Sequence, residues 1–152
     1  MFRDGNIHGV KVRRLEEFHD SRGWLSELYR MDELGEYTPA MGYISITFPL
    51  FTRGPHEHSE QTDYFCFFGT FSLYLWDNRK GSSTYGNRMV IENADRSVVV
   101  VPPGIVHAYR NSGEKEGMVL NFPDRLYAGK GRKEKVDEVR YEDDPASPFV
   151  VA

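Results

Sequence analysis

Short β-prone runs, each ended by turn-forming residues, limit the folds that this chain can adopt. They are rich in β-branched and aromatic residues and lie at 10–15, 24–29, 42–48, within 53–69 (two runs), 71–76, 89–91, 97–101, 107–109 and 118–122. Clusters of Gly, Pro, Asn and Asp separate them, as turns between strands require. We expect 71–76 to form a hairpin with the run before it, and 107–109 to pair with 118–122. The pattern predicts an all-β sandwich or a jelly-roll barrel.

The length and composition of the chain agree with this fold class. Its 152 residues suffice for a single domain, residues 1–152, with a buried core. Phe and Tyr dominate the apolar residues, which favours strands over helices. After residue 127 the sequence becomes charged and poor in core residues. We therefore expect a short irregular or helical C-terminal segment.

Charge and hydropathy exclude several classes of partner. The net charge of −4 and the pI near 5.7 argue against nucleic acid. The longest apolar run, 98–101, is far too short to span a bilayer, and the N-terminal residues lack the apolar stretch of a signal peptide. We expect a cytoplasmic protein without a membrane partner. Cys66 is the single cysteine, so no internal disulfide can form, and we expect it in the core.

Two segments contain the residues that could act in catalysis or ligand binding. In the first, RGPHEH, His56 and His58 stand at i and i+2, a spacing that places both imidazoles on one face of a strand. In the second, VVVVPPGIVH, a Pro-Pro-Gly turn precedes His107. Three histidines and Arg53, supplied by two strands, predict a polar cavity inside a barrel.

These segments carry a family resemblance. The spacings His56-x-His58-x3-Thr62-x6-Gly69 and Pro102-x-Gly104-x2-His107-x3-Asn111 resemble the paired cupin motifs. Within the cupins the chain is most similar to the dTDP-4-dehydrorhamnose 3,5-epimerase family, from about residue 20 to residue 145. The similarity rests on the segments DSRGWLSE, RGPH, WDNRKGSSTYG, PPGIVHAY and DDP. It implies a cupin β-jelly-roll and a nucleotide-linked 4-keto sugar as substrate.

The resemblance also implies a mechanism. Inverting a carbon beside a ketone requires a base, a group that stabilises the enolate and an acid on the opposite face. By motif, His56 is the base and Asp144 is the carboxylate that orients it, with the neighbouring Asp143 as the alternative. His58 is then a further polar contact or proton relay. The residues expected to bind substrate are Arg53 at the diphosphate, Arg22 and Glu27 at the nucleotide, His107, Tyr64 and Thr62.

The chain departs from the family pattern at two catalytic positions. Thr62 stands where the family has a lysine, and Leu120 or Asn121 stands where it has a tyrosine acid. Other groups, with Tyr64, Tyr43, Tyr109 and His58 the nearest candidates, must then fill these roles. Otherwise the reaction is that of a sugar 3,4-ketoisomerase, or the protein binds a sugar nucleotide without catalysis.

A metal centre is the alternative to cofactor-free chemistry. Many cupins bind a divalent transition metal through three histidines and a glutamate. Here His56, His58 and His107 are available, but Thr62 occupies the glutamate position. Asp63 is one residue further on, so a regular strand would turn it to the opposite face unless a bulge intervenes.

The strand around Cys66 also predicts the oligomeric state. Phe65 and Phe67 alternate with Tyr64 and Cys66, so both faces of this strand are apolar. Such a strand is buried on both sides, with one face toward the barrel and the other under a second sheet or subunit. We therefore expect a homodimer.

Overall fold

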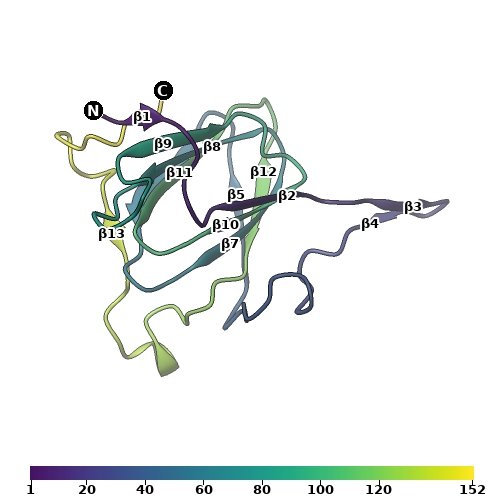
Figure 1. The fold of residues 1–152 in the computed structure, drawn as a ribbon. Helices are drawn as coiled ribbons and strands as arrows, with labels where there is room; N and C mark the ends of the chain where they lie inside the picture. Colours follow the sequence, from purple (N-terminus) through teal and green to yellow (C-terminus); the bar gives the residue numbers. More distant parts are fainter.

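The computed structural model describes all 152 residues and consists of two β-sheets packed face to face. One sheet has the strand order β1-β9-β8-β11-β6-β13 and the other β2-β10-β7-β12-β5, while β3 and β4 form a separate hairpin. Figure 1 shows the two sheets wrapped around one interior. This arrangement confirms the all-β jelly-roll. No helix is long and apolar enough to cross a membrane.

Most elements are joined by short connections, and the longest run from β4 to β5 and from β12 to β13. They are β1 (Arg3–Asp4), β2 (Lys11–Arg14), β3 (Phe18–Asp20), β4 (Gly23–Leu25), β5 (Tyr43–Thr47), β6 (Thr52–Glu57), β7 (Asp63–Phe68), β8 (Phe71–Asp77), β9 (Asn87–Ile91), β10 (Ser97–Val101), β11 (Ile105–Asn111), β12 (Gly117–Asn121), the 3-10 turn η1 (Lys130–Arg132) and β13 (Val139–Arg140). The expected strand at 24–29 is shorter than predicted, because only Gly23–Leu25 is paired.

Both predicted strand pairings are wrong. β8 pairs with β9 and β11, whereas β7, the strand just before it, pairs with β10 and β12. β11 and β12 likewise lie in different sheets. Each tight turn therefore carries the chain from one sheet to the other. Both sheets present apolar residues to the shared interior, so crossing between them buries more surface than a hairpin would.

The main core lies between the sheets and is unusually aromatic. The rings of Phe67, Phe71 and Tyr109 pack edge to face or tilted, with centroids 5.5–5.7 Å apart. Such contacts add to the free energy gained by burying apolar area. Phe65 also faces this interior. The inward face of β7 is thus one wall of the barrel.

The outward face of β7 is covered by another part of the same chain. Tyr64 and Cys66 pack there against Leu28, Tyr29 and other residues of the segment 28–37. Cys66 is buried, as the sequence predicted, and burial raises the pKa of its thiol to about 12. A strand with two apolar faces is therefore accounted for within one subunit.

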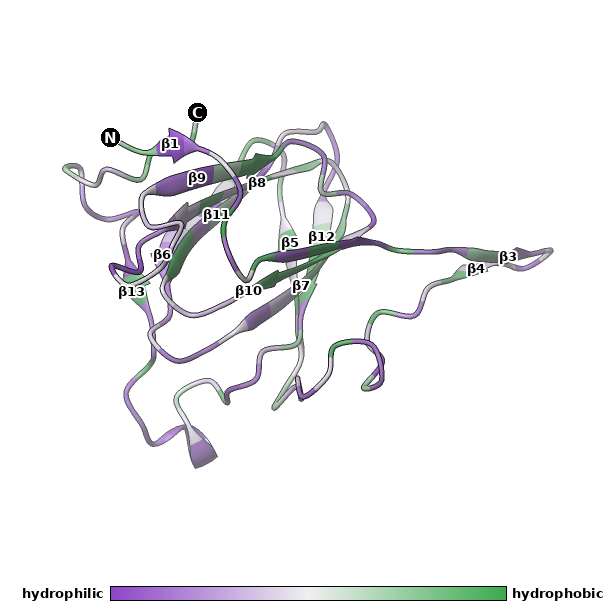
Figure 2. Cartoon of the chain, in the orientation of Figure 1, coloured by the Kyte–Doolittle hydropathy of each residue, from purple (hydrophilic) through white to green (hydrophobic).

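Two features extend from the barrel. The β3–β4 hairpin projects away from it (Figure 1) and leaves Phe18, Trp24 and Leu25 between 45% and 61% exposed. Residues 124–137, which we term the wall segment, hang from one end of the barrel. Figure 2 shows that the part of the wall segment around η1 is hydrophilic.

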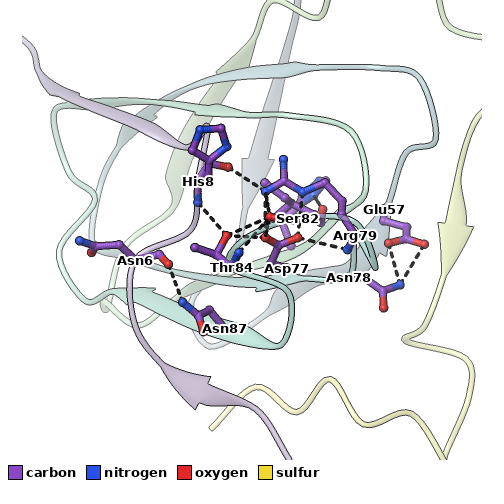
Figure 3. Close-up of polar contacts among 11 residues, drawn as sticks. Asn6, His8, Glu57, Asp77, Asn78, Arg79, Ser82, Thr84 and Asn87 are labelled. Carbon is purple, nitrogen blue, oxygen red and sulfur yellow. Dashed lines mark hydrogen bonds and ion pairs between the residues drawn. The ribbon is translucent and has the colours of Figure 1, made fainter.

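A buried carboxylate, Asp77, helps to hold the segment between β1 and β2 against the barrel. Asp77 accepts hydrogen bonds from Arg79 Nε (2.8 Å), Ser82 Oγ (2.7 Å) and Thr84 Oγ1 (2.6 Å). Arg79 donates in turn to the carbonyl of His8 at 2.7 Å, as Figure 3 shows. These contacts explain the polar segment WDNRKGSSTYG structurally, because they close the turn after β8.

Candidate active site

Strand pairing brings His56 and His107 together. They are direct partners across β6 and β11. Gly54 makes the close approach possible, because it has a φ of +87° and a Cβ there would lie 2.5 Å from the carbonyl oxygen of His107. The ring centroids of His56 and His107 are 4.5 Å apart, and His58 lies 5.7 and 5.5 Å from the two. The structure thus gathers the three histidines singled out by the sequence.

A carboxylate that sequence reasoning placed on the wrong face completes this group. Asp63 begins β7 and points into the barrel on the same face as Phe65 and Phe67, not the opposite one. Its Oδ2 lies 3.2 Å from His58 Nε2 and 3.3 Å from His107 Nε2. The turn 59–62 separates β6 from β7, so the alternation counted from His58 does not continue into the new strand.

Buried amides hold the other oxygen of Asp63. Asn121 Nδ2 and Gln61 Nε2 each donate to Oδ1 at 2.8 Å. Asn121 also donates to the phenol oxygen of Tyr43 at 3.0 Å and accepts from the backbone N–H of Tyr64. The carboxylate of Asp63 is thereby fixed in position, and Asn121 links it to the titratable hydroxyl of Tyr43.

Backbone carbonyls fix the orientation of two of the imidazoles. Nδ1 of His107 donates to the carbonyl of Ile105 at 3.0 Å, and Nδ1 of His58 donates to the carbonyl of Asp137. A carbonyl oxygen can only accept, so each Nδ1 carries a hydrogen. The Nε2 atoms of both rings consequently face Asp63.

The surroundings of the three histidines shift their pKa values in different directions. Burial alone would lower the pKa of His58, but Asp63 and the Asp137 carbonyl outweigh it and raise the pKa to about 9. Burial lowers the pKa of His107, and Asp63 offsets this only in part. Burial, together with the nearby His107 and His58, brings the pKa of His56 to about 2. At neutral pH His58 is therefore charged and His56 is neutral.

The expected partner of His56 lies elsewhere. No ion pair or hydrogen bond joins the His56 side chain to a carboxylate, and Asp144 instead accepts the N–H of Ala146 at 2.9 Å. Residue Arg140 of β13 stands opposite His56 in the sheet. The structure records no contact between His56 and Asp144, and their pairing stays a prediction.

A cavity of about 960 Å³ opens in front of the histidines. His56, His58, Arg53, Tyr43 and Tyr109 line it, and most of the wall segment forms its far side. Nε of Arg53 donates to Thr47 Oγ1 at 3.1 Å and one terminal nitrogen donates to the carbonyl of Ile46 at 2.9 Å. The cavity is large enough for a nucleotide sugar.

Two carboxylates anchor the wall segment at its ends. The backbone N–H groups of Ser59, Glu60 and Gln61 donate to Asp137 at 2.7–3.0 Å. The next N–H, that of Thr62, donates to Asp124 at 2.8 Å. Four consecutive N–H groups of one turn therefore hold both ends of the segment. Thr62 serves here through its backbone and does not line the cavity.

Three further predicted residues are not at the cavity. Tyr64 lies on the outward face of β7, where its hydroxyl donates to the carbonyl of Leu28. Arg22 lies in the projecting hairpin and pairs with Asp20 at 2.5 Å, and Glu27 pairs with Arg30 at 3.6 Å. Neither Arg22 nor Glu27 lines the cavity.

The sequence contained a signal that Asp63 is buried among polar partners. Asp63 heads the run DYFCFF, and an acidic residue in a strand of apolar residues is buried only when it has partners. Asn121 ends β12 in the same way, as a polar residue after MVL.

The histidine cluster has the geometry of a metal site. One nitrogen of each of His56, His58 and His107 lies within 4.8 Å of the others. Asp63 would add an oxygen ligand, and the two Nδ1–H groups bound to carbonyls leave Nε2 free to ligate. These four residues could therefore hold a divalent transition metal.

Comparisons with known proteins agree with one another. The sequence profile described as dTDP-4-dehydrorhamnose 3,5-epimerase matches residues 4–144. A probable low-salt glycan biosynthesis epimerase of Haloferax volcanii is 35% identical over 127 residues, which cover 80% of this chain and 81% of that protein. A spore coat polysaccharide biosynthesis protein of Bacillus subtilis is 32% identical over 125 residues, covering 80% and 82%.

Solved structures show the same fold. The crystal structure of a dTDP sugar isomerase from Desulfovibrio desulfuricans G20 superposes with a TM-score of 0.80 at 21% identity. The superposition covers 95% of this chain and 91% of that one. At this level of identity the likeness concerns the fold.

Proposed function

The chain belongs to the dTDP-4-dehydrorhamnose 3,5-epimerase family, and from that we propose that its cavity binds a nucleotide-linked 4-keto sugar and moves protons beside the ketone. The enzyme is thus an isomerase-class protein of glycan or polysaccharide biosynthesis. The observation that carries the proposal is that His56, which makes no side-chain hydrogen bond, lies beside His58 on the wall of one cavity.

His56 suits the role of base. Its ring lines the cavity and makes no hydrogen bond, so one nitrogen is free to take a proton. Burial lowers its pKa to about 2, which keeps this nitrogen unprotonated but makes it a weak base in the free protein. In the reaction the C–H bond next to the ketone breaks, its proton goes to His56, and the electron pair forms an enolate. Return of a proton to either face completes the step.

Tyr43 suits the role of acid. Its hydroxyl lies at the cavity, bound to Asn121, and burial raises its pKa to about 12. The phenol therefore keeps its proton at neutral pH and can return it to the enolate. It stands on β5 beside β12, one of whose residues occupies the family's tyrosine position. With base and acid both supplied by side chains, the reaction needs no cofactor.

The arrangement of Arg53 and Arg22 supports a homodimer. Arg53 faces the cavity and can clasp the diphosphate with its remaining terminal nitrogen. Arg22 and Glu27 lie in or beside a hairpin that projects from the subunit with apolar side chains exposed (Figure 1). We place this hairpin against a second copy, where it delivers both residues to the neighbouring cavity. Light scattering that shows only monomer at micromolar concentration would contradict this arrangement.

The test is deuterium uptake from solvent into a dTDP-4-keto-6-deoxyhexose, followed by NMR. We expect His56→Asn to abolish uptake and Tyr43→Phe to retain uptake while losing net product. His8→Asn is the matched control, because this exposed side chain lies outside the cavity. Uptake at the parent rate in His56→Asn would show that His56 is not the base.

The product identifies the reaction. An inverted ring carbon indicates an epimerase, and a ketone moved to the neighbouring carbon indicates a 3,4-ketoisomerase. A parent protein that binds the nucleotide sugar without any uptake would show binding alone and end the catalytic proposal.

A further inference from the structure

The proposed reaction leaves one role without a residue. His56 takes the proton and Tyr43 returns one, but the electron pair of the broken C–H bond places a negative charge on the ketone oxygen. Active sites that accelerate such a step hold hydrogen-bond donors or cations where that charge develops. The lysine and arginine side chains that line the cavity are Arg53, Arg125, Lys130, Arg132, Lys135 and Arg140.

Of these cations, Arg140 is the one placed in register with His56. Strand β13 pairs antiparallel with β6, and Arg140 is the direct partner of His56. Side chains of direct partners lie on the same face of a sheet, with Cβ atoms about 4.5–5.5 Å apart. The next residue, Tyr141, points to the opposite face, where its hydroxyl donates to Glu57 at 2.9 Å. The side chain of Arg140 therefore shares the cavity face with the proposed base.

The other cations are placed differently. Arg53 stands on β6 as well, but it donates to Thr47 and to the carbonyl of Ile46 on the neighbouring strand β5. The remaining four belong to the wall segment, which forms another side of the cavity. None of these five is paired with His56 in the sheet.

The guanidinium of Arg140 is held at one edge and open at the other. Its Nε donates to Glu138 at 2.7 Å, and its Nη1 lies 3.7 Å from a carboxylate oxygen of Glu142. Neither terminal nitrogen donates a hydrogen bond within the protein. Both can therefore donate to one oxygen atom of a ligand, and the rigid fork of the guanidinium limits the entropy lost in doing so.

The flanking carboxylates indicate which part of the substrate Arg140 meets. Glu138 and Glu142 line the cavity together with Arg140. Two negative side chains repel a diphosphate, whereas a ketone carries no charge until its neighbouring carbon loses a proton. The surroundings of Arg140 thus favour the sugar end of the substrate, and Arg53 with the wall segment is left for the diphosphate.

Resting on the proposed function, we propose that Arg140 is a catalytic residue that stabilises the enolate. As the C–H bond breaks and its proton goes to His56, the electron pair moves onto the ketone oxygen, which accepts hydrogen bonds from the terminal nitrogens of Arg140. The guanidinium stays charged throughout and transfers no proton. It binds the charged oxygen more strongly than the neutral ketone, so it lowers the barrier and not merely the energy of the bound substrate.

The first test is deuterium uptake at saturating substrate, together with the Kd for dTDP from calorimetry. We expect Arg140→Met to lower uptake by about 100-fold while the Kd for dTDP changes less than about 3-fold. Arg140→Lys keeps the charge without the fork and should recover part of the rate. Arg88→Met is the matched control, because Arg88 also pairs with a carboxylate, Asp4 at 3.5 Å, but does not line this cavity.

Two kinetic results would overturn the proposal. One is uptake at the parent rate in Arg140→Met. The other is a rise of about tenfold in the Kd for dTDP with parent uptake at saturation, because Arg140 would then bind the diphosphate. If Arg140→Met does not fold, Arg140→Gln removes the same charge and is judged by the same outcomes.

The infrared C=O stretch of the bound keto sugar supplies a readout that a merely structural role would not move. It is measured in the His56→Asn background, where the ketone is retained because His56 cannot take the proton. We expect a lower frequency with Arg140 present than after adding Arg140→Met, since the guanidinium polarises the carbonyl. Equal frequencies would overturn the proposal. A parent that takes up no deuterium would refute the proposed function, whereas the carbonyl stretch still decides whether Arg140 contacts the ketone.

Discussion

Gly54 lies against the carbonyl oxygen of His107, at a distance that leaves no room for a side chain. We expect Gly54→Ala to destabilise the protein by about 3 kcal/mol or more, because the new methyl group would clash 2.5 Å from that oxygen in a left-handed backbone conformation. Urea unfolding measures the change. Gly81→Ala is the control, since nothing lies within 4 Å of its Cβ position, and it should stay close to the parent. If both substitutions changed the free energy of unfolding equally, β6 and β11 could move apart at Gly54 without loss of stability.

Stability should fall as the pH rises above neutrality. The pKa of His58 rises on folding from 6.5 to about 9, so the protonated ring stabilises the fold fully below pH 6.5. That contribution, about 3 kcal/mol, is lost as the pH passes through about 9. The pKa of Asp63 is lowered on folding, so its contribution is lost only in acid.

The measurement is the free energy of unfolding in urea between pH 6 and about 9.5. Asp63→Asn should give a flatter curve over this range, because His58 loses the partner that raises its pKa. A parent curve that is level from pH 6.5 to 9 would contradict the pairing.

Subunits with complementary defects should rescue each other. Arg22→Ala and Arg53→Ala homodimers are both expected to lose activity, but a hybrid has one cavity with both arginines intact. Random pairing on co-expression then gives about a quarter of the parent activity. If Arg22 served its own subunit, both cavities of the hybrid would be defective and no rescue would follow.

Cations of the wall segment should strengthen binding of the diphosphate. Lys130, Arg132 and Lys135 line the cavity, whereas Lys133 of the same segment does not. Each Ala substitution at a lining position should raise the Kd for dTDP about 3- to 10-fold, less at high salt. Lys133→Ala is the matched control, and the same loss there would mean that the effect is one of net charge alone. Calorimetric titration provides the values.

Local patterns in the sequence predicted the strands and the convergence of His56, His58 and His107. They could do so because strand alternation and turn chemistry are determined within a few residues. The pairing of β8 with β11 could not be predicted in this way, since it depends on which sheet each strand joins.

Three carboxylates show where sequence spacing gives no information about side-chain position. Asp63 faces inward because the turn 59–62 resets the alternation, a geometric effect with no trace in spacing alone. Asp144 was assigned from a family motif, and the contact that the structure records for its carboxylate is local, with the N–H of Ala146. Asp137, which in fact holds the turn and orients His58, lies in a segment that composition describes only as charged.

The two anchors of the wall segment divide the lining of the cavity into two structural parts. Asp124 and Asp137 tie residues 125–136 to one turn beside β7, while the histidines and Asp63 stand on the barrel itself. The residues between the anchors can therefore be exchanged as a unit without moving the reacting groups. Under the proposed function, replacing residues 125–136 between the two anchors would change which nucleotide sugar the cavity accepts.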